Sequence, residues 1–219
     1  MAKAFEQVLA RIEEAIATEG LKVGDRLPGE RQLAEQLSVS RASVREALRA
    51  LSTLGVVSSQ VGRGPDAGAV LTSRPGAALA GLVRLNLGLD AFSMREVIGA
   101  RLMIEQWAAV QAAHLKSGTA EMARAIDAMD RAAGPEEFVA GDIAFHLALV
   151  AAAGNRLTTA VLEALRASVH RYAIAAVVRL GDTSGLQEGH RLILRAVEDG
   201  DAGGAVTAVT AHLAYAYPE

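Results

Sequence analysis

Hydrophobic residues in the first quarter of the chain recur with the period of three short helices. They are spaced three or four residues apart over residues 5–16, 33–37 and 44–51, with charged residues between them. Pro28 lies in the turn before the second run, where a helix cannot continue, and Ser40 is placed to accept a hydrogen bond from the first amides of the third run. The pattern therefore predicts three helices joined by short turns.

Two β-branched stretches follow in VVSSQVGRGPDAGAVLT, residues 56–72, and a Gly, Pro and Asp cluster separates them. This pattern predicts a β-hairpin. After SRPG, at residues 73–76, the chain changes to long alanine- and leucine-rich segments. We therefore expect one domain over residues 1–72, a linker and connecting helix over 73–92, and a second domain over 93–219.

The second domain is predicted to be an antiparallel helical bundle of six or seven helices, because its apolar residues keep the helical period through most of its length. Asn155, Gly181 and a DGDAGG run mark gaps between the helices. The predicted helical runs cover residues 77–88, 93–115, 119–131, 136–153, 156–180, 185–199 and 203–216. The fold class is thus mainly α, with a small β-hairpin in the first domain.

Composition supports this fold class and restricts the chemistry. Only 4% of the residues are aromatic, which favours helices that pack through small and aliphatic side chains. There is no cysteine, which excludes disulfides, thiolate metal sites and cysteine nucleophiles. The first 17 residues carry several charges, and no apolar run reaches about 18 residues, so we expect neither a signal peptide nor a membrane span. The expected location is the cytoplasm.

Three arginines form a regular series in SVSRASVREALRAL, residues 38–51. On a helix, Arg41, Arg45 and Arg49 lie at about 60°, 100° and 140° from Val44, beside the apolar stripe and outside it. Two short helices joined by a tight turn, with basic side chains on the second, have the geometry of a helix-turn-helix that reads the major groove of DNA. Arginine suits this task because its planar group can donate two hydrogen bonds to guanine.

The alternative is a solvated helix face, on which Arg45 and Arg49 only form ion pairs with Glu46 or with acids elsewhere on the surface. Net charge does not decide between the two, because it is −3 overall while residues 1–72 carry 9 basic and 9 acidic groups. The tip of the predicted hairpin favours DNA. There GRG, at residues 62–64, combines backbone freedom with one guanidinium, as a loop beside a phosphate or a minor groove requires.

Residues 22–64 resemble the winged helix-turn-helix of the GntR family of bacterial transcription regulators, through VGDRLPGERQLAEQLSVSRASVREALRALSTLGVV and the GRG wing. The resemblance implies a double-stranded DNA operator as partner. Gly29 stands where the family usually has a small hydroxyl residue, between the proline and the glutamate. We therefore expect the predicted second helix to lack the side-chain cap that such a residue would supply. The candidate DNA-binding residues are Arg31, Arg41, Ser43, Arg45, Arg49, Arg63 and Gly64.

All five histidines lie in the second domain. Asp142 and His146 are four residues apart and so share a helix face, although such a pair is more often a surface pair than a metal site. His190 and His212 lie in two predicted helices that a short loop joins, as in an antiparallel helical hairpin. With about 11 residues on each side of the loop, the two histidines would lie at the same height along the hairpin. Together the four could supply three imidazoles and a carboxylate, a set suited to Zn²⁺, Ni²⁺ or Mn²⁺.

Residues 93–216 resemble the FCD ligand-sensing domain of the FadR-like GntR subfamily, through REVIGARLMIEQWAAVQAA, DIAFHLALVAAAGN and HRLILRAVEDGDAGGAVTAVTAHL. The resemblance implies a divalent metal held by these four residues, a small organic-acid effector beside it, and a homodimer. The candidate effector-binding residues are Arg101, His170 and Asn155. For Arg101 the alternative is an ion pair with Glu105, and for His170 it is a capping or core position. Trp107 and Phe145 are expected in the core.

These expectations favour a dimeric, ligand-responsive transcription regulator, most simply a repressor, and not an enzyme. A metal-dependent hydrolase is the rival, because a site with open metal positions can activate water. No separate general base stands at a recognisable spacing to support it. A third possibility is a DNA-binding protein whose metal is purely structural.

Overall fold

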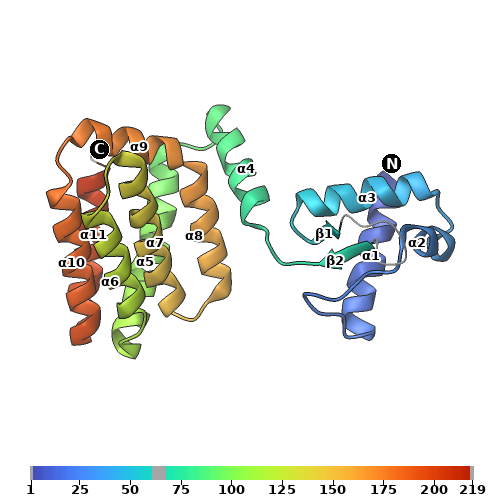
Figure 1. Cartoon of the computed structure of the whole chain (residues 1–219), viewed down its shortest axis with the longest axis horizontal. Helices are drawn as coiled ribbons and strands as arrows, with labels where there is room; N and C mark the ends of the chain where they lie inside the picture. Colours follow the sequence, from blue (N-terminus) through green and yellow to red (C-terminus); the bar gives the residue numbers. More distant parts are fainter. Residues whose placement is uncertain (1, 61–67, 218–219) are drawn as a thin grey trace. The chain divides into compact units, whose positions relative to one another are not determined.

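The computed structural model describes residues 2–60 and 68–217, and it divides the chain into two compact units, Met1–Ala78 and Leu79–Glu219. Helices make up most of both units, and the described residues contain one antiparallel hairpin (Figure 1). The predicted fold class, mainly α with a small two-stranded wing, is confirmed. No helix in the described part of the chain is long and apolar enough to cross a membrane.

The first unit contains three helices and the hairpin, close to the predicted ranges. Its elements are α1 (Ala2–Thr18), α2 (Glu30–Leu37), α3 (Arg41–Thr53), β1 (Val57–Gln60) and β2 (Gly68–Leu71). The Ser40 hydroxyl accepts a hydrogen bond from the Ser43 amide at 3.0 Å and so caps α3, as predicted. Gly29 gives α2 no side-chain cap. The apolar stripe of α3 is buried: Val44, Ala47, Leu48 and Leu51.

Gly55 fixes how the chain leaves the hairpin. Its backbone has a φ of +74°, and a Cβ atom there would lie 2.1 Å from the carbonyl oxygen of Arg74. The Gly55 carbonyl accepts hydrogen bonds from the Arg74 amide at 3.0 Å and from the Thr72 hydroxyl at 2.9 Å. Only glycine tolerates both the dihedral angle and the close approach. The segment after β2 is therefore fastened to the C-terminal end of α3.

The second unit is a bundle of antiparallel helices, preceded by α4. Its elements are α4 (Gly76–Gly88), α5 (Met94–Leu115), α6 (Thr119–Asp130), α7 (Pro135–Ala152), α8 (Arg156–Ser168), α9 (His170–Leu180), α10 (Ser184–Asp199) and α11 (Ala202–Ala216). The predicted single helix over 156–180 is wrong, since it breaks into α8 and α9. Val169 has non-helical angles (φ −107°, ψ 12°), and its side chain packs with Val83 and Val97. Tertiary packing thus ends a helix where no glycine or proline marks a break.

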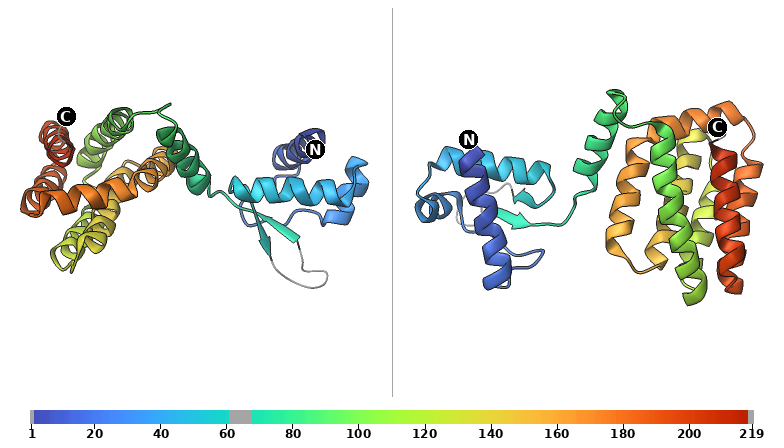
Figure 2. Two further views of the ribbon diagram at one scale, coloured as in Figure 1. Left: turned by 90° about the horizontal axis from the view of Figure 1, so that it is seen from above. Right: turned by 180° about the vertical axis from the view of Figure 1, so that it is seen from behind.

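Helix α5 is central to the bundle and packs against α7, α8, α10 and α11 (Figure 2, right). Its buried positions are mostly alanines, which let neighbouring helices approach closely. Helices α6 and α7 are also close, because a Cβ atom on Gly141 would lie 2.6 Å from Cγ of Met129. Phe145 is fully buried, as expected, whereas Trp107 is 39% exposed and lies outside the core.

Candidate functional site

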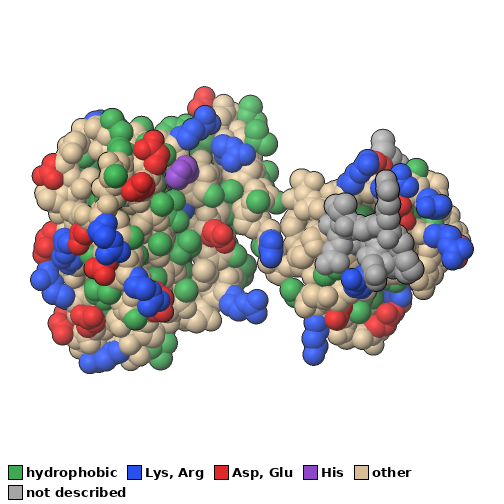
Figure 3. Space-filling view, viewed as in Figure 1, with side chains coloured by type: hydrophobic (Ala, Val, Ile, Leu, Met, Phe, Trp, Pro, Cys, Tyr) green, Lys and Arg blue, Asp and Glu red, His purple; other side chains and the backbone are tan. Residues whose placement is uncertain are grey.

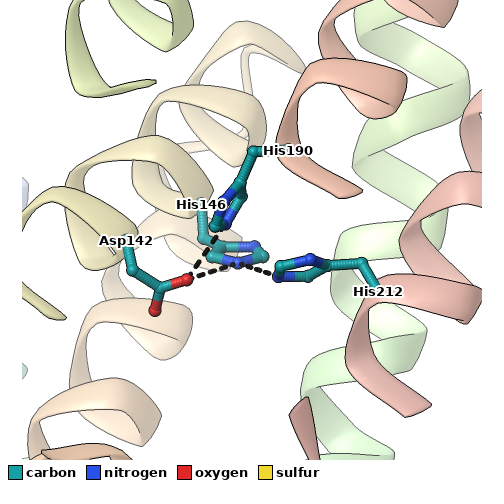
Figure 4. Close-up of side chains that lie close together, drawn as sticks. All are labelled: Asp142, His146, His190 and His212. Atoms are coloured by element: carbon teal, nitrogen blue, oxygen red, sulfur yellow. Dashed lines mark hydrogen bonds and ion pairs between the residues drawn. The ribbon is translucent and has the colours of Figure 1, made fainter. Parts of the chain in front are cut away.

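The bundle brings together all four residues predicted as metal ligands. Asp142 and His146 come from α7, His190 from α10 and His212 from α11, and one ligand atom from each lies within 4.8 Å of the others (Figure 4). Helices α10 and α11 form the predicted hairpin, so the rings of His190 and His212 have centroids 4.2 Å apart. All three imidazoles are buried.

The ligand atoms converge with spacings that fit a metal ion. Oδ1 of Asp142 lies 3.0 Å from Nε2 of His190 and 3.4 Å from Nε2 of His146. Nε2 of His146 lies 3.2 Å from Nε2 of His212. Metal–ligand bonds of about 2.1 Å separate neighbouring ligand atoms by roughly 3.0 to 3.4 Å in octahedral or tetrahedral sites. The residues present therefore fit a divalent ion of the Zn²⁺, Ni²⁺ or Mn²⁺ type.

Gly189, next to His190, leaves room for this arrangement. A Cβ atom at Gly189 would lie 2.6 Å from Nδ1 of His212. A side chain on this turn of α10 would push the His212 ring out of its position. The glycine is thus part of the candidate site, although it offers no ligand atom.

The electrostatics of the site keep its groups in the protonation states that bind metals. Burial opposes ionisation of Asp142, but the charge of Arg166 and the hydrogen bonds from His146 and His190 outweigh it and hold the pKa of the carboxyl well below its usual value. Burial lowers the pKa of His190 and, together with the neighbouring imidazoles, lowers the pKa of His212 well below its usual value. A carboxylate and neutral imidazoles are the ligating forms.

Two residues that the sequence did not predict as site members support the ligands. Nη2 of Arg166 contacts Oδ2 of Asp142, which leaves Oδ1 facing the imidazoles. Oε2 of Glu105 lies 2.5 Å from Nδ1 of His146, and this contact favours the tautomer whose Nε2 lone pair is free for a metal. The only sequence signal was the position of Glu105, one helical turn after Arg101.

Arg101 is 1% exposed and pairs with Glu105, from Nε to Oε1 at 3.0 Å. The expected ion pair is therefore present, and it lies inside the site because Glu105 also contacts His146. Burial opposes both charges, yet the partners lower the pKa of Glu105 far below its usual value and raise that of Arg101. Arg101 lines a cavity of about 20 Å³ together with Asp142, His146, His212 and Tyr217.

The other two candidates for effector binding do not lie in this cluster. His170 is an exposed residue at the start of α9. Asn155 is the exposed N-cap of α8, and its side chain accepts hydrogen bonds from the amides of Leu157 and Thr158. A helix break at Val169 and a helix cap at Asn155 thus turn both side chains to the surface of the bundle.

In the first unit the arginine series lies on the exposed side of α3. Arg45 pairs with Glu30 at 3.2 Å and Arg49 with Glu46 at 2.6 Å, yet these arginine side chains keep 49% and 67% exposure. The alternative expectation of surface ion pairs is therefore met, without removing either guanidinium from solvent. Arg41 is exposed as well.

The remaining candidates for DNA contact differ in their surroundings. Arg31, on the first turn of α2, keeps 80% exposure and lies 3.9 Å from Glu35. Ser43 is half-buried, with its hydroxyl 2.9 Å from that of Ser40, so its side chain takes part in the cap. Arg63 and Gly64, at the predicted wing tip, lie outside the described residues.

Comparisons with known proteins agree with this architecture. Residues 4–65 match the bacterial regulatory proteins of the gntR family, and residues 96–215 match the FCD domain. The chain is 29% identical over 217 residues to the "Putative L-lactate dehydrogenase operon regulatory protein" of Escherichia coli (strain K12). The aligned region covers 97% of this chain and 84% of that protein. It is 30% identical over 205 residues to the HTH-type transcriptional regulator LutR of Bacillus subtilis (strain 168), over 88% of this chain and 90% of that one.

A solved structure, "Streptococcus agalactiae GntR", shares the fold with a TM-score of 0.68 and 24% identity, over 95% of this chain and 96% of that chain. The matched domains and relatives are transcriptional regulators and not enzymes, which sets aside the metal-dependent hydrolase considered above. The first unit has a helix with exposed arginines beside a hairpin, and the second is a helical bundle. The FCD match alone covers more than half of the chain. The chain belongs to the GntR family of bacterial transcriptional regulators, with an FCD domain in its C-terminal unit.

Proposed function

We propose that this regulator is a FadR-like homodimeric repressor, whose affinity for its operator is controlled by a small carboxylate bound beside a divalent metal. The observation that carries the proposal is the cluster of the half-buried Asp142 with the buried His146, His190 and His212, next to the buried guanidinium of Arg101. A bound metal would supply a Lewis-acid position for a carboxylate oxygen. Arg101 would hold the carboxylate by charge-assisted hydrogen bonds. The protein acts in the cytoplasm, where its operator is.

On the DNA side, Arg41 and Arg45 are proposed to contact bases or phosphates, with Arg49 on phosphate or in support of the other two. The ion pairs of Arg45 and Arg49 do not oppose this role, because exposed pairs contribute only about 0–1 kcal/mol and can be exchanged for DNA phosphates. Arg31 and the wing residues Arg63 and Gly64 are proposed to complete this contact surface, by the resemblance of residues 22–64 to the winged helix-turn-helix of the family.

The homodimer is supported by apolar side chains that the second unit leaves in solvent. Met103 is 73% and Trp107 39% exposed, one turn apart on α5. Leu157, at the start of the neighbouring α8, is also exposed, and hydrophobic side chains are visible along α4 (Figure 3). Apolar surface of this kind is typical of residues that a partner covers. A second copy of the chain is the proposed partner.

The proposed switch is a shift between two arrangements of the dimer. An effector can change operator affinity only if it binds one arrangement more tightly than the other. The metal ligands come from α7, α10 and α11, while Glu105 and Arg101 belong to α5. A carboxylate held by these residues would therefore favour one packing of four helices.

The first effector to test is L-lactate, because a regulator 29% identical to this chain is named for an L-lactate dehydrogenase operon. Operator DNA is titrated by fluorescence anisotropy with zinc-loaded protein, with and without L-lactate. The proposal expects weaker binding with L-lactate. Arg101→Ala leaves Glu105 as an unpaired buried charge, so its folding is first checked by its melting temperature; the folded variant should lose this response and keep the basal affinity. A purely structural metal predicts instead that no organic acid changes DNA affinity or the melting temperature, although removal of the metal lowers stability.

A further inference from the structure

Tyr217 follows the last residue of α11 and reaches back to Arg101. Its hydroxyl lies 3.4 Å from Nη1 of Arg101, and the guanidinium carbon lies 5.6 Å from the centre of the tyrosine ring. Its amide donates a hydrogen bond to the Leu213 carbonyl at 3.0 Å, which holds the residue against the end of the helix. The aromatic ring thus covers a buried cation at a distance typical of cation–π contacts.

Arg101 keeps its two terminal nitrogens for a ligand. Nε donates to Oε1 of Glu105 at 3.0 Å, whereas Nη2 is buried without a hydrogen-bond partner and Nη1 faces the hydroxyl of Tyr217. A carboxylate that binds both terminal nitrogens needs Nη1 as well as Nη2. The phenol therefore occupies one of the two positions on Arg101 that the proposed effector would take.

Two hollows meet at Tyr217. The inner one, beside the metal ligands, has about 20 Å³, which is enough for roughly one water molecule. The outer one has about 780 Å³ and lies between the start of α5 and the end of α11, where Met94, Ile98 and Leu102 line it. Tyr217 and Leu213 line both hollows. The tyrosine ring is thus part of the wall between a chamber too small for an organic acid and a groove large enough to admit one.

We propose that Tyr217 is the gate of the effector site and an internal competitor of the effector. In the effector-free protein its phenol holds Arg101 and closes the inner chamber. A small organic acid enters from the outer groove, displaces the ring, and takes Nη1 of Arg101 with its carboxylate. The chemical identity of the ligand rests on the function proposed above, whereas the closure of the chamber by Tyr217 rests on the geometry alone.

The gate also sets which acids fit. When the ring leaves, the volume it occupied joins the inner chamber to the groove, and the groove walls are mostly apolar: Met94, Ile98, Gly99, Leu102, Leu213 and Ala214. An acid with its carboxylate at Arg101 would direct its remaining atoms into this space. The fit is best for a carboxylate on a short, partly apolar carbon chain.

Closure is tested without any effector, by diethyl pyrocarbonate labelling of metal-free protein and peptide mapping. The probe acylates accessible neutral imidazoles, so exposed His170 should react quickly and buried His212 slowly. Tyr217→Ala should accelerate labelling of His212 by about tenfold or more, as expected when a closed site becomes open. The control is Tyr215→Ala, two residues earlier, where the ring packs against Gly185 instead of Arg101. His212 labelling that changes less than about twofold in Tyr217→Ala would overturn the gate.

Competition is tested with L-lactate and zinc-loaded protein by isothermal titration calorimetry. Tyr217→Phe keeps the ring and loses the hydroxyl, so it should bind L-lactate several-fold more tightly, while His212 labelling stays at the wild-type rate. Tyr217→Ala should bind at least as tightly as Tyr217→Phe. If Tyr217→Ala does not fold, the Tyr217→Phe titration decides, and an affinity equal to that of wild type overturns the competitor role.

The two proposals fail in different ways. If no variant binds L-lactate but His212 becomes reactive in Tyr217→Ala, the gate stands and the proposed effector is wrong. If wild type and both Tyr217 variants bind L-lactate equally and His212 stays protected, the effector stands and the gate is wrong.

Discussion

The two units use arginine and carboxylate pairs in opposite ways. On α3 the side chains of Arg45 and Arg49 stay about half exposed or more, and their partners Glu30, on α2, and Glu46 are themselves partly exposed. In the bundle Arg101 and Glu105 are sealed inside, and Arg166 is buried against Asp142. An exposed pair contributes about 0–1 kcal/mol, whereas removing one partner of a buried pair costs about 3–5 kcal/mol.

This difference shows what each set of charges is suited to do. The exposed arginines can exchange a carboxylate for a DNA phosphate at little cost, so they suit a surface that binds and releases. The buried pairs hold the ligand atoms of one site in place, because Glu105 orients His146 and Arg166 orients Asp142. The two sets should therefore respond to substitution as differently as their burial implies.

The largest effect is expected from Glu105→Gln. The change keeps the shape of the side chain but leaves Arg101 as an uncompensated buried charge, so the second unit should lose about 3–5 kcal/mol of unfolding free energy. Urea unfolding followed through Trp107, the one tryptophan in the chain and a residue of α5, measures it. The matched exposed change is Glu46→Gln, which removes the partner of Arg49 and should cost at most about 1 kcal/mol. Equal losses in the two variants would contradict the comparison.

The next effect is the loss of metal from the double variant His190→Ala and His212→Ala. With two of four ligands removed, elemental analysis of dialysed protein should find no bound metal. Added Zn²⁺ should also no longer stabilise the protein. In wild type this stabilisation is about 2.7 kcal/mol when the free Zn²⁺ concentration is a hundred times the Kd. The exposed histidine supplies the control, since His170→Ala should leave metal content unchanged. Stoichiometric metal in the double variant would show that the four residues are not the site.

Arg45→Ala should weaken operator binding by about 1–3 kcal/mol if the guanidinium makes a two-bond contact with a base. Fluorescence anisotropy titrations at fixed salt measure the change. Because Arg45 is exposed, the unfolding free energy should stay close to that of wild type, unlike that of the Glu105 variant. A DNA affinity that does not change would remove Arg45 from the contact surface.

The smallest effect is expected for the unfolding free energy of the metal-free protein when the pH is lowered from neutral. Burial lowers the pKa of His190 and His212, so the folded state binds fewer protons than the unfolded chain, where a histidine pKa is about 6.5. Stability of the second unit is thus complete above that value and should fall as the pH drops through it. Residues 1–78 contain no histidine and should lack this transition. Chemical unfolding at pH 7.5 and pH 5.5 tests it, and a second unit that is equally stable at both values would contradict the assignment.

Helical period and sequence spacing predicted most of the elements, including the buried stripe of α3 and the Ser40 cap. They could not predict the break at Val169, because valine does not interrupt a helical pattern and its packing with residues of α4 and α5 is a tertiary contact. The exposure of Trp107 was not predicted either. A large aromatic residue fits a core pattern, whereas its position on α5 leaves it at the surface.

The candidate site was predicted in part. Histidine is rare in this chain, so His146, His190 and His212 stood out and helical spacing could align them. Arginine and glutamate are common on helix surfaces, and nothing in their spacing shows that Arg166 and Glu105 are buried. The contact of Tyr217 with Arg101 joins residues 116 positions apart. Periodicity describes one helix at a time and carries no information on such a contact.

The close approach at Gly55 has a mechanical consequence for regulation. Residues 72 and 74 are hydrogen-bonded to Gly55, two residues after α3, so the polypeptide that continues beyond the hairpin is attached next to the helix that bears the arginines. Under the proposed switch, a movement of the chain beyond residue 75 would reach the end of α3 directly. A side chain at position 55 would clash with the Arg74 carbonyl, and we expect it to weaken the proposed effector response without altering the metal-ligand cluster or the exposed arginines.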